Sequence, residues 1–356
     1  MLTEILKKRL EKQHYKIVGS HSAVKTCEWT KKMIRGQGGC YKLKFYGIQS
    51  NQCMQMTTSI SCANRCDYCW RDLKAPVAKE WRWLSDTPED IFSQSILSHH
   101  KLLTGFKGSK KTNLASYELS KTIRHVALSL TGEPIIYPRI NELIKIFDKN
   151  KISTFHVTHG QYPEAIKALA PVTQLYLSIN STTPEMYKII DRPLFPDYWE
   201  KQEESLAFFA EKKQRKCIRL TAIKGFNMIA PEKHAALLLK ASPDFIEVKA
   251  YMHIGASAYR LKRECMPSHA EVADFAIKLA KHLKDYEVVA EHIPSQVVLI
   301  AHKKFLRNKA WYTWIDFDKY HKLVLSGKEF STEDYLKQTP AVGISGETMK
   351  EVEKLN

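Results

Sequence analysis

Three cysteines within eight positions are the residues most suited to chemistry. In "SISCANRCDYCW", residues 59–70, three and then two residues separate Cys62, Cys66 and Cys69. A zinc ribbon would supply paired C-x2-C hooks and four ligands. Three thiolates leave one position open, as in a [4Fe–4S] cluster whose fourth iron is free to bind a small molecule. A structural zinc site with a distant fourth ligand is the alternative.

A second set of three cysteines precedes the first. Twelve residues separate Cys27 from Cys40, and twelve more separate Cys40 from Cys53. These three thiols suggest a second cluster with an open iron, but wide spacing carries little geometric information and free buried cysteines are common. Cys217 and Cys265 are expected to be ordinary thiols.

The cysteine content also indicates the compartment. Eight cysteines in 356 residues are too few for a disulfide scaffold, so clustered thiols point to metal in a reducing environment. No apolar run reaches the roughly 18 residues of a membrane helix, and residues 1–19 have a charged amphipathic helix pattern without the features of a secretory signal. We expect a soluble, cytoplasmic protein that does not enter membranes.

The charge balance suggests a polyanionic partner. Lys and Arg total 55 against 38 Asp and Glu, a formal net charge of +17. Such an excess attracts phosphate backbones, although a lysine-rich solvated surface would give the same count.

The elements that must position the thiols alternate between strand and helix patterns. Apolar, β-branched runs predict six strands: Met54–Ile60, Ile123–Leu130, Ile152–Thr158, Gln174–Ile179, Ile218–Ile223 and Phe245–Ala250. Helix starts are marked between and after them by Asp86 or Thr87 with Pro88, Thr183 with Pro184, and a capping box of Ser268 and Glu271.

Six successive strand–helix units imply an α/β fold with a parallel sheet and helices outside it. Residues 1–52 precede the first expected strand and form an N-terminal extension with three cysteines, residues 53–301 form the core, and residues 302–356 form a C-terminal extension with interleaved bases and aromatics. Ligands of such sheets bind at the carboxyl ends of the strands, where the chemistry is expected.

The C-x3-C-x2-C spacing, with Tyr68 before the last cysteine and after the first strand, resembles the radical S-adenosylmethionine (SAM) superfamily. The resemblance implies a (βα)6 partial TIM-type barrel in which SAM completes the cluster. It also implies cofactor contacts from the turn Thr131-Gly132-Glu133 in "LTGEP", and from Ser178 and Asn180 in "LYLSINS". A polar turn that caps the next helix is the alternative for the last two.

"CMQMTTSISCANRCDYCWRDLK", "LTGEPIIYP", "LYLSINSTTPE" and "FIEVKAYMHIG" together resemble the archaeal-type tRNA 4-demethylwyosine synthases over residues 20 to 300. This family condenses N1-methylguanosine at position 37 of phenylalanine tRNA with pyruvate, through a 5′-deoxyadenosyl radical. The resemblance implies a second [4Fe–4S] cluster on Cys27, Cys40 and Cys53, an external electron donor of flavodoxin or ferredoxin type, and a monomer.

A lysine near the middle cysteine is implied as well. In "CYKLKF" this is Lys42, whose amine would form a Schiff base with pyruvate. Lys44 is two residues on and would face the same side of a strand, so the choice of Lys42 depends on the resemblance. Glu247 and Lys249 alternate to one face of the last strand and are candidate substrate or cofactor contacts, or only a structural pair.

Basic and aromatic segments are candidates for tRNA binding, because exposed loop bases stack on aromatic side chains. They are Trp29 with Lys31, Lys32 and Arg35, the lysines of residues 107–111, and the segment Trp311–Trp314. Two rival functions stay open: a radical SAM enzyme with another RNA or small-molecule substrate, and a non-catalytic, zinc-bound RNA-binding module.

Overall fold

A ten-stranded sheet forms the centre of the computed structural model, which describes residues 2–356. Its six inner strands run parallel, so the expected (βα)6 partial barrel is confirmed. The strands are β3 (Cys53–Thr57), β4 (His125–Leu128), β5 (Ser153–Thr158), β6 (Gln174–Ser178), β7 (Arg215–Ala222) and β8 (Phe245–Ala250). All six strands predicted from the sequence are present.

Antiparallel strands extend this sheet at both edges. β1 (Lys16–Val18) and β2 (Ser22–Lys25) join β3, while β10 (Val297–His302) and β9 (Tyr286–His292) join β8. The expectation that residues 1–52 precede the first strand was therefore wrong. Runs of three and four residues are too short for their periodicity to be read. β2 becomes a strand by pairing with the free edge of β3, and β1 by pairing with β2.

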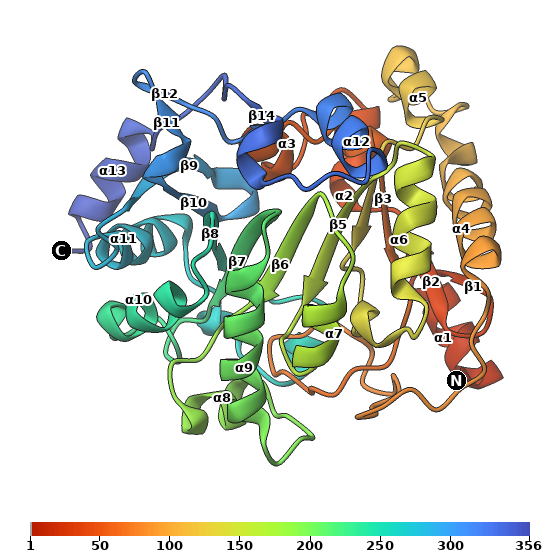
Figure 1. Ribbon diagram of the computed structural model, residues 1–356, viewed down its shortest axis with the longest axis horizontal. Coiled ribbons are helices and arrows are strands. Elements are labelled where there is room, and N and C mark those ends of the chain that lie inside the picture. Colours follow the sequence, from red (N-terminus) through yellow and green to blue (C-terminus); the bar gives the residue numbers. More distant parts are fainter. Residues whose placement is uncertain (1) are drawn as a thin grey trace.

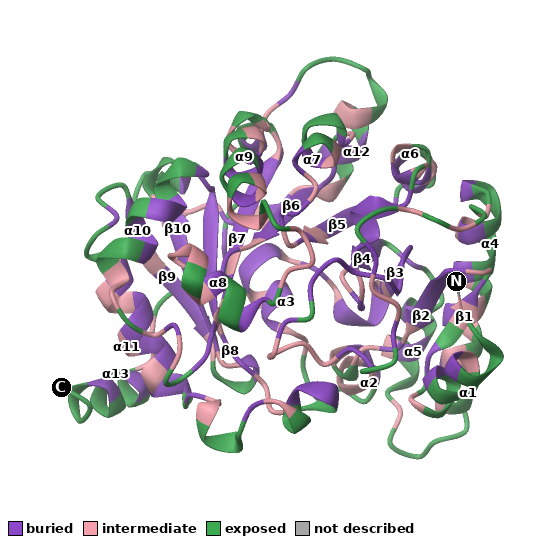
Figure 2. Ribbon diagram, turned by 90° about the horizontal axis from the view of Figure 1, so that it is seen from below, coloured by how far each residue is buried: buried purple, intermediate pink, exposed green. Residues whose placement is uncertain are grey.

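Helices surround the outer face of the barrel (Figure 2). They are α4 (Pro88–Leu103), α5 (Leu114–Ser120), α6 (Ile140–Lys149), α7 (Pro163–Ala168), α8 (Pro184–Ile190), α9 (Tyr198–Glu211), α10 (Pro231–Lys240) and α11 (His269–Ala280). The predicted starts are confirmed: Thr87 and Thr183 accept helix-cap hydrogen bonds, and Ser268 with Glu271 forms a capping box. A large apolar core fills the space between these helices and the sheet.

The N-terminal helices have different positions. α1 (Glu4–Lys12) begins the chain, whereas α2 (Glu28–Ile34) and α3 (Tyr41–Tyr46) lie toward the upper, amino-terminal ends of the parallel strands in Figure 1. Figure 2 shows α3 inside the curve of the strands. Its Phe45 and Tyr46 belong to a second core cluster that fills the barrel interior.

The C-terminal extension covers α3. This extension contains two small sheets: β11 (Leu306–Arg307) pairs with β12 (Ala310–Trp311), and β13 (Trp314–Ile315) pairs with β14 (Leu336–Lys337). In the chain, α12 (Phe317–Leu325) lies between β13 and β14, and α13 (Gly346–Glu353) follows β14. Thr313 Oγ1 donates to Phe45 O at 2.6 Å and Trp314 Nε1 to Lys44 O at 2.9 Å. Within residues 2–356, no helix is long and apolar enough to cross a membrane. The division of the chain into extensions and core, after residues 52 and 301, stays a prediction.

Candidate active site

The loop that follows β3 carries the first three cysteines. All eight cysteines of the chain are free thiols, and Cys62 and Cys66 are buried. Arg71 holds this loop from inside: its guanidinium donates to Ile60 O at 3.2 Å, Asn64 O at 3.1 Å and Pro76 O at 3.2 Å. A planar fork of donors can bind several carbonyls at once, so Arg71 ties together three backbone segments of the loop.

The Thr131-Gly132-Glu133 turn packs directly against this loop. Gly132 has φ +69°, and a Cβ there would lie 1.9 Å from Ser59 O, so only glycine fits. The backbone that approaches the glycine is therefore the start of the cysteine loop. Glu133 N donates to Ser61 O at 2.8 Å, which joins the turn to the loop a second time.

The carboxylate of Glu133 lies near the thiol of Cys62. Its Oε2 lies 2.9 Å from His159 Nε2, and single ligand atoms of Cys62, Glu133 and His159 lie within 4.8 Å of one another. Burial opposes ionisation of Glu133, but His159 lowers the pKa of this carboxyl below its ordinary value. Glu133 Oε1, Thr131 Oγ1 and Ser61 Oγ are buried and have no hydrogen-bond partner within the described chain. The site thus has free polar atoms for a ligand beside the thiols.

Tyr68 and Asn180 meet in one hydrogen-bond network. Asn180 Nδ2 donates to Tyr68 Oη at 2.6 Å, and Tyr68 Oη donates to Asp191 Oδ1 at 2.6 Å. Ser181 Oγ donates to the other oxygen of Asp191 at 3.1 Å, and burial raises the pKa of this carboxyl. Ser178 is half-buried at the end of β6. Tyr68 and Asn180, which the sequence predicted as cofactor contacts, therefore meet in the structure. Asp191, which contacts both, was not predicted.

The second set of thiols lies at the other end of β3. Cys53 is the first residue of β3, and Cys27 follows the end of β2, which is paired antiparallel with β3. Cys27 and Cys40 are the N-caps of α2 and α3. Burial raises the pKa of the Cys53 thiol to about 12, while nearby Lys42 lowers it and the thiols of Cys40 and Cys27 raise it. The three cysteines, distant in sequence, are therefore neighbours.

Lys42 projects from α3 into the barrel interior beside these thiols. Its Nζ lies 4.9 Å from the ring centroid of Tyr176 and 5.5 Å from that of Phe155. Only 8% of the residue is exposed. Burial lowers the pKa of the Lys42 ammonium, and Arg219 lowers it further. These surroundings increase the fraction of the neutral, nucleophilic amine.

Lys42 and Lys44 do not share a face, so that expectation was wrong. Residues 41–46 form a helix, in which positions i and i+2 are about 200° apart. Lys44 is only half-buried and lies near His292. The alternation in "YKLKFY" resembles a strand, but burial of Tyr41, Phe45 and Tyr46 in the barrel favours the helix.

Glu247 and Lys249 also line the interior. Arg219 donates to Glu247 Oε2 at 2.9 Å, and Tyr46 Oη donates to Oε1 at 2.9 Å, which accounts for the charge of this fully buried carboxylate. Lys249 Nζ donates to Ser295 O at 2.6 Å, and burial lowers its pKa to about 8. Glu247 therefore belongs to a structural ion pair, whereas Lys249 keeps donors for a ligand.

The strand β5 connects the two sets of thiols. Its Phe155 contacts Lys42, and His159, four residues later, contacts Glu133 and Cys62. Four residues of strand span on the order of 13 Å. The two sets of thiols therefore lie near opposite ends of the same strand.

The suggested RNA-binding segments are partly engaged in packing. Trp29 packs edge-on against His292 at 5.2 Å, with Lys32 Nζ 4.6 Å from its ring, and Trp314 is bound to α3. The lysines of residues 107–111 are exposed. None of these segments forms a cavity with converging donors in the described structure.

Several residues of the site were missed in the sequence. His159 directly follows a predicted strand, a position that could have marked it. Arg219 is a charged residue inside the apolar β7, which is also a visible signal. Asp191 follows a helix in a polar turn, and no pattern distinguishes it from an ordinary surface aspartate.

A parallel six-stranded partial barrel with three cysteines after its first strand defines the radical SAM class of fold. A family model described as wyosine base formation matches residues 240–302. The solved structure of TYW1 with a lysine-pyruvate adduct bound has a TM-score of 0.76 and 35% identity, covering 85% of this chain and 97% of that one. The crystal structure of archaeal TYW1 has a TM-score of 0.70 and 32% identity, covering 85% and 98%.

The chain belongs to the TYW1 family of tRNA 4-demethylwyosine synthases. The SAM-dependent tRNA 4-demethylwyosine synthase of Oryza sativa subsp. japonica is 47% identical over 349 residues, 97% of this chain and 53% of that protein. The chain thus spans about half the length of the curated relatives it matches.

Proposed function

We propose that this chain is a tRNA-modifying radical SAM enzyme that condenses N1-methylguanosine at position 37 of phenylalanine tRNA with pyruvate to form 4-demethylwyosine. The observation that carries the proposal is Lys42, a buried amine inside the barrel beside the second set of thiols. A solved relative is described as holding a lysine-pyruvate adduct, which supports this role.

The residues fit the cofactors that the proposal requires. Cys62, Cys66 and Cys69 would hold one [4Fe–4S] cluster, and Cys27, Cys40 and Cys53 would hold a second. The buried, unpartnered oxygens of Thr131 and Glu133 are suited to the amino group of SAM, because an ammonium binds a carboxylate and a hydroxyl. Tyr68, Asn180 and Ser178 would complete that site. When bound, cluster and SAM supply a 5′-deoxyadenosyl radical that removes hydrogen from the N1-methyl group.

The contribution of the protein's own side chains to the proposed reaction comes from Lys42 and the residues around it. The neutral amine of Lys42 attacks the carbonyl carbon of pyruvate, and water leaves as the Schiff base forms. Lys249, which donates to Ser295 O, has further donors for the pyruvate carboxylate. The aromatic rings of Phe155 and Tyr176 exclude water from this adduct. The acceptor carbon is then held at a fixed position in the barrel.

Iron analysis tests the two-cluster part of the proposal. Anaerobically reconstituted protein should contain about eight irons, and a Cys27/Cys40/Cys53 triple alanine variant about four. Zinc in place of iron would favour an RNA-binding module, and an unchanged iron content in the variant would refute the second cluster.

Product analysis tests the reaction. With SAM, pyruvate and a reductant, the enzyme should convert tRNA that carries N1-methylguanosine at position 37 into tricyclic product, as read by mass spectrometry of the nucleosides. The same tRNA with guanosine at that position should stay unchanged, because it lacks the methyl group. SAM cleavage without any pyruvate-dependent product would instead favour another substrate. Reduction by a flavodoxin or ferredoxin in place of a chemical reductant would identify the type of external donor, and sedimentation would test the expected monomer.

A further inference from the structure

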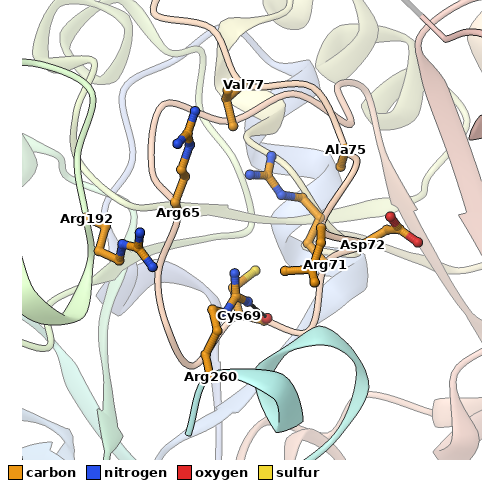
Figure 3. Close-up of a pocket in the computed structure, with 9 residues that line it drawn as sticks. Arg65, Cys69, Arg71, Asp72, Ala75, Val77, Arg192 and Arg260 are labelled. Carbon is orange, nitrogen blue, oxygen red and sulfur yellow. Dashed lines mark hydrogen bonds between the residues drawn. The ribbon is translucent and has the colours of Figure 1, made fainter.

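A cavity lined by arginines opens beside the first cysteine loop. Its volume is about 340 Å³, and its walls include four guanidinium groups, those of Arg65, Arg71, Arg192 and Arg260. Figure 3 shows these arginines together with Cys69, which lines the same cavity and lies next to Arg260. These residues come from the loop after β3, from the turn after α8 and from the segment after β8, so the cavity lies where the strands end.

The arginines carry more positive charge than the nearby acids balance. In the described residues, Arg192 is the one ion-paired member of the four, with Asp67 at 3.1 Å. Arg71 is engaged with backbone carbonyls, and Arg260 donates through Nη2 to Cys69 O. Arg260 Nε is buried without a hydrogen-bond partner, and the exposed guanidinium of Arg65 has no carboxylate within reach in residues 2–356. Arg65 and Arg260 therefore have N–H groups that are free to bind a ligand in the cavity.

Asp72 also lines the cavity but does not neutralise it. Both carboxylate oxygens accept from Arg9 Nη2 at 3.0 Å, and Gln13 Nε2 donates to one of them at 2.7 Å. Figure 3 shows this carboxylate directed away from the four guanidinium groups. A cationic cavity of this kind is stabilised by an anion that accepts several hydrogen bonds.

Apolar side chains next to the arginines favour a nucleic acid as the source of that anion. Tyr259 precedes Arg260 and is 83% exposed, and Leu73, in the cavity wall, is 54% exposed. An exposed aromatic residue next in sequence to an arginine of the cavity matches single-stranded RNA, whose unstacked bases bind aromatic faces while the phosphates bind arginine.

We propose that the cavity lined by Arg65, Arg71, Arg192 and Arg260 binds one backbone phosphate of the tRNA anticodon loop, with Tyr259 as a stacking surface for an adjacent base. This inference rests on the proposed function and assigns a binding site for its substrate. An enzyme that acts on a single base must take it out of the stack, and a phosphate held at the entrance fixes the nucleotide that enters the barrel.

The test uses reconstituted holoenzyme and a fluorescent anticodon stem–loop RNA with N1-methylguanosine at position 37. The variant Arg65→Gln/Arg192→Gln removes two exposed charges and leaves Arg71 and Arg260, which hold the cysteine loop. Arg124→Gln is the control, because Arg124 is an exposed, ion-paired arginine at the amino-terminal end of β4. Binding by the double variant should be about ten- to a hundredfold weaker, with a shallower salt dependence, at unchanged iron content.

Neutral methylphosphonate linkages, placed one at a time along the RNA loop, identify the phosphate. One position should weaken binding to the wild-type protein and have no further effect in the double variant. The inference fails if the double variant binds every RNA as tightly as Arg124→Gln does. It also fails if RNA binding is unchanged while reduction by a flavodoxin is lost and reduction by dithionite is kept, since the cavity would then bind an acidic electron donor. Absence of any tricyclic product with the wild-type enzyme would instead refute the proposed function.

Discussion

At the scale of single residues, Lys42 and Lys44 form a natural pair of test and control. Both are lysines of the same short helix, but Lys42 points into the barrel and Lys44 lies near its edge. With pyruvate and cyanoborohydride, the wild-type holoenzyme should acquire a stable adduct that peptide mapping places on Lys42. Lys42→Ala should lose the adduct and product formation, because the other interior lysine, Lys249, is already engaged with Ser295 O, whereas Lys44→Ala should keep both. An adduct that maps to Lys249 would contradict this assignment.

Gly132 is the second residue-scale test. A Cβ at Gly132 would collide with Ser59 O, whereas Gly225 has a similar φ of +81° and nothing within 4 Å of an added Cβ. Left-handed backbone alone costs about 1–2 kcal/mol, so Gly225→Ala should lower the free energy of unfolding by that amount. Gly132→Ala should lower it by about 3 kcal/mol or more and reduce iron incorporation, because the cysteine loop must move. Chemical denaturation and iron analysis measure both effects, and equal losses in the two variants would contradict the clash.

At the scale of elements, Asp148 makes the contact between α6 and α12 dependent on pH. Burial raises the pKa of this carboxyl to about 7, and the only hydrogen bond to it from α12 is that of Tyr320 Oη at 3.5 Å in the described structure. The unfolded value is about 3.9. Because the folded protein binds the extra proton between about pH 4 and pH 7, the free energy of unfolding should fall as pH rises through that interval.

Asp148→Asn cannot ionise and should remove this pH-dependent loss. At pH 8 the variant should be more stable than the wild type by up to about 4 kcal/mol, and the two should converge near pH 4. Thermal unfolding from pH 4 to pH 8 measures the difference. Asp318→Asn, at an exposed position, is the control and should follow the wild type. The prediction would be contradicted if the free energy of unfolding changed with pH in the same way in all three proteins, since ionisation of Asp148 would then not destabilise the folded protein.

The elements that sequence predicted correctly are those with local signals. The six parallel strands and the capped helices α4, α8 and α11 are marked by apolar periodicity, proline and capping residues within a few positions. β1, β2 and α3 were not predicted, because their conformations depend on a neighbouring strand or on burial in the barrel. The spacing of Cys62, Cys66 and Cys69 suggested a metal site, whereas the prediction for Cys27, Cys40 and Cys53 depended on the family resemblance, and the Lys42 surroundings required the helix.

At the scale of the whole molecule, the charge of +17 indicated a polyanion but not where it binds. The segments richest in bases and aromatics are partly packed, whereas the four arginines of the cavity come from three segments that are distant in the chain. Such a site has no sequence pattern, because strand ends distant in the chain meet only in the folded barrel. In the same barrel, Lys42 lies beside Phe155 of β5, whereas Cys62 of the first cysteine loop lies beside His159, which follows β5.

The central claim is that radical chemistry acts on the N1-methyl group of the tRNA base while pyruvate is held on Lys42. The most direct measurement uses tRNA with a deuterated N1-methyl group at position 37, the reconstituted enzyme, SAM, pyruvate and a reductant. We expect the 5′-deoxyadenosine formed to contain deuterium and the tricyclic product to accumulate. Unlabelled 5′-deoxyadenosine, with the methylated base intact, would contradict it.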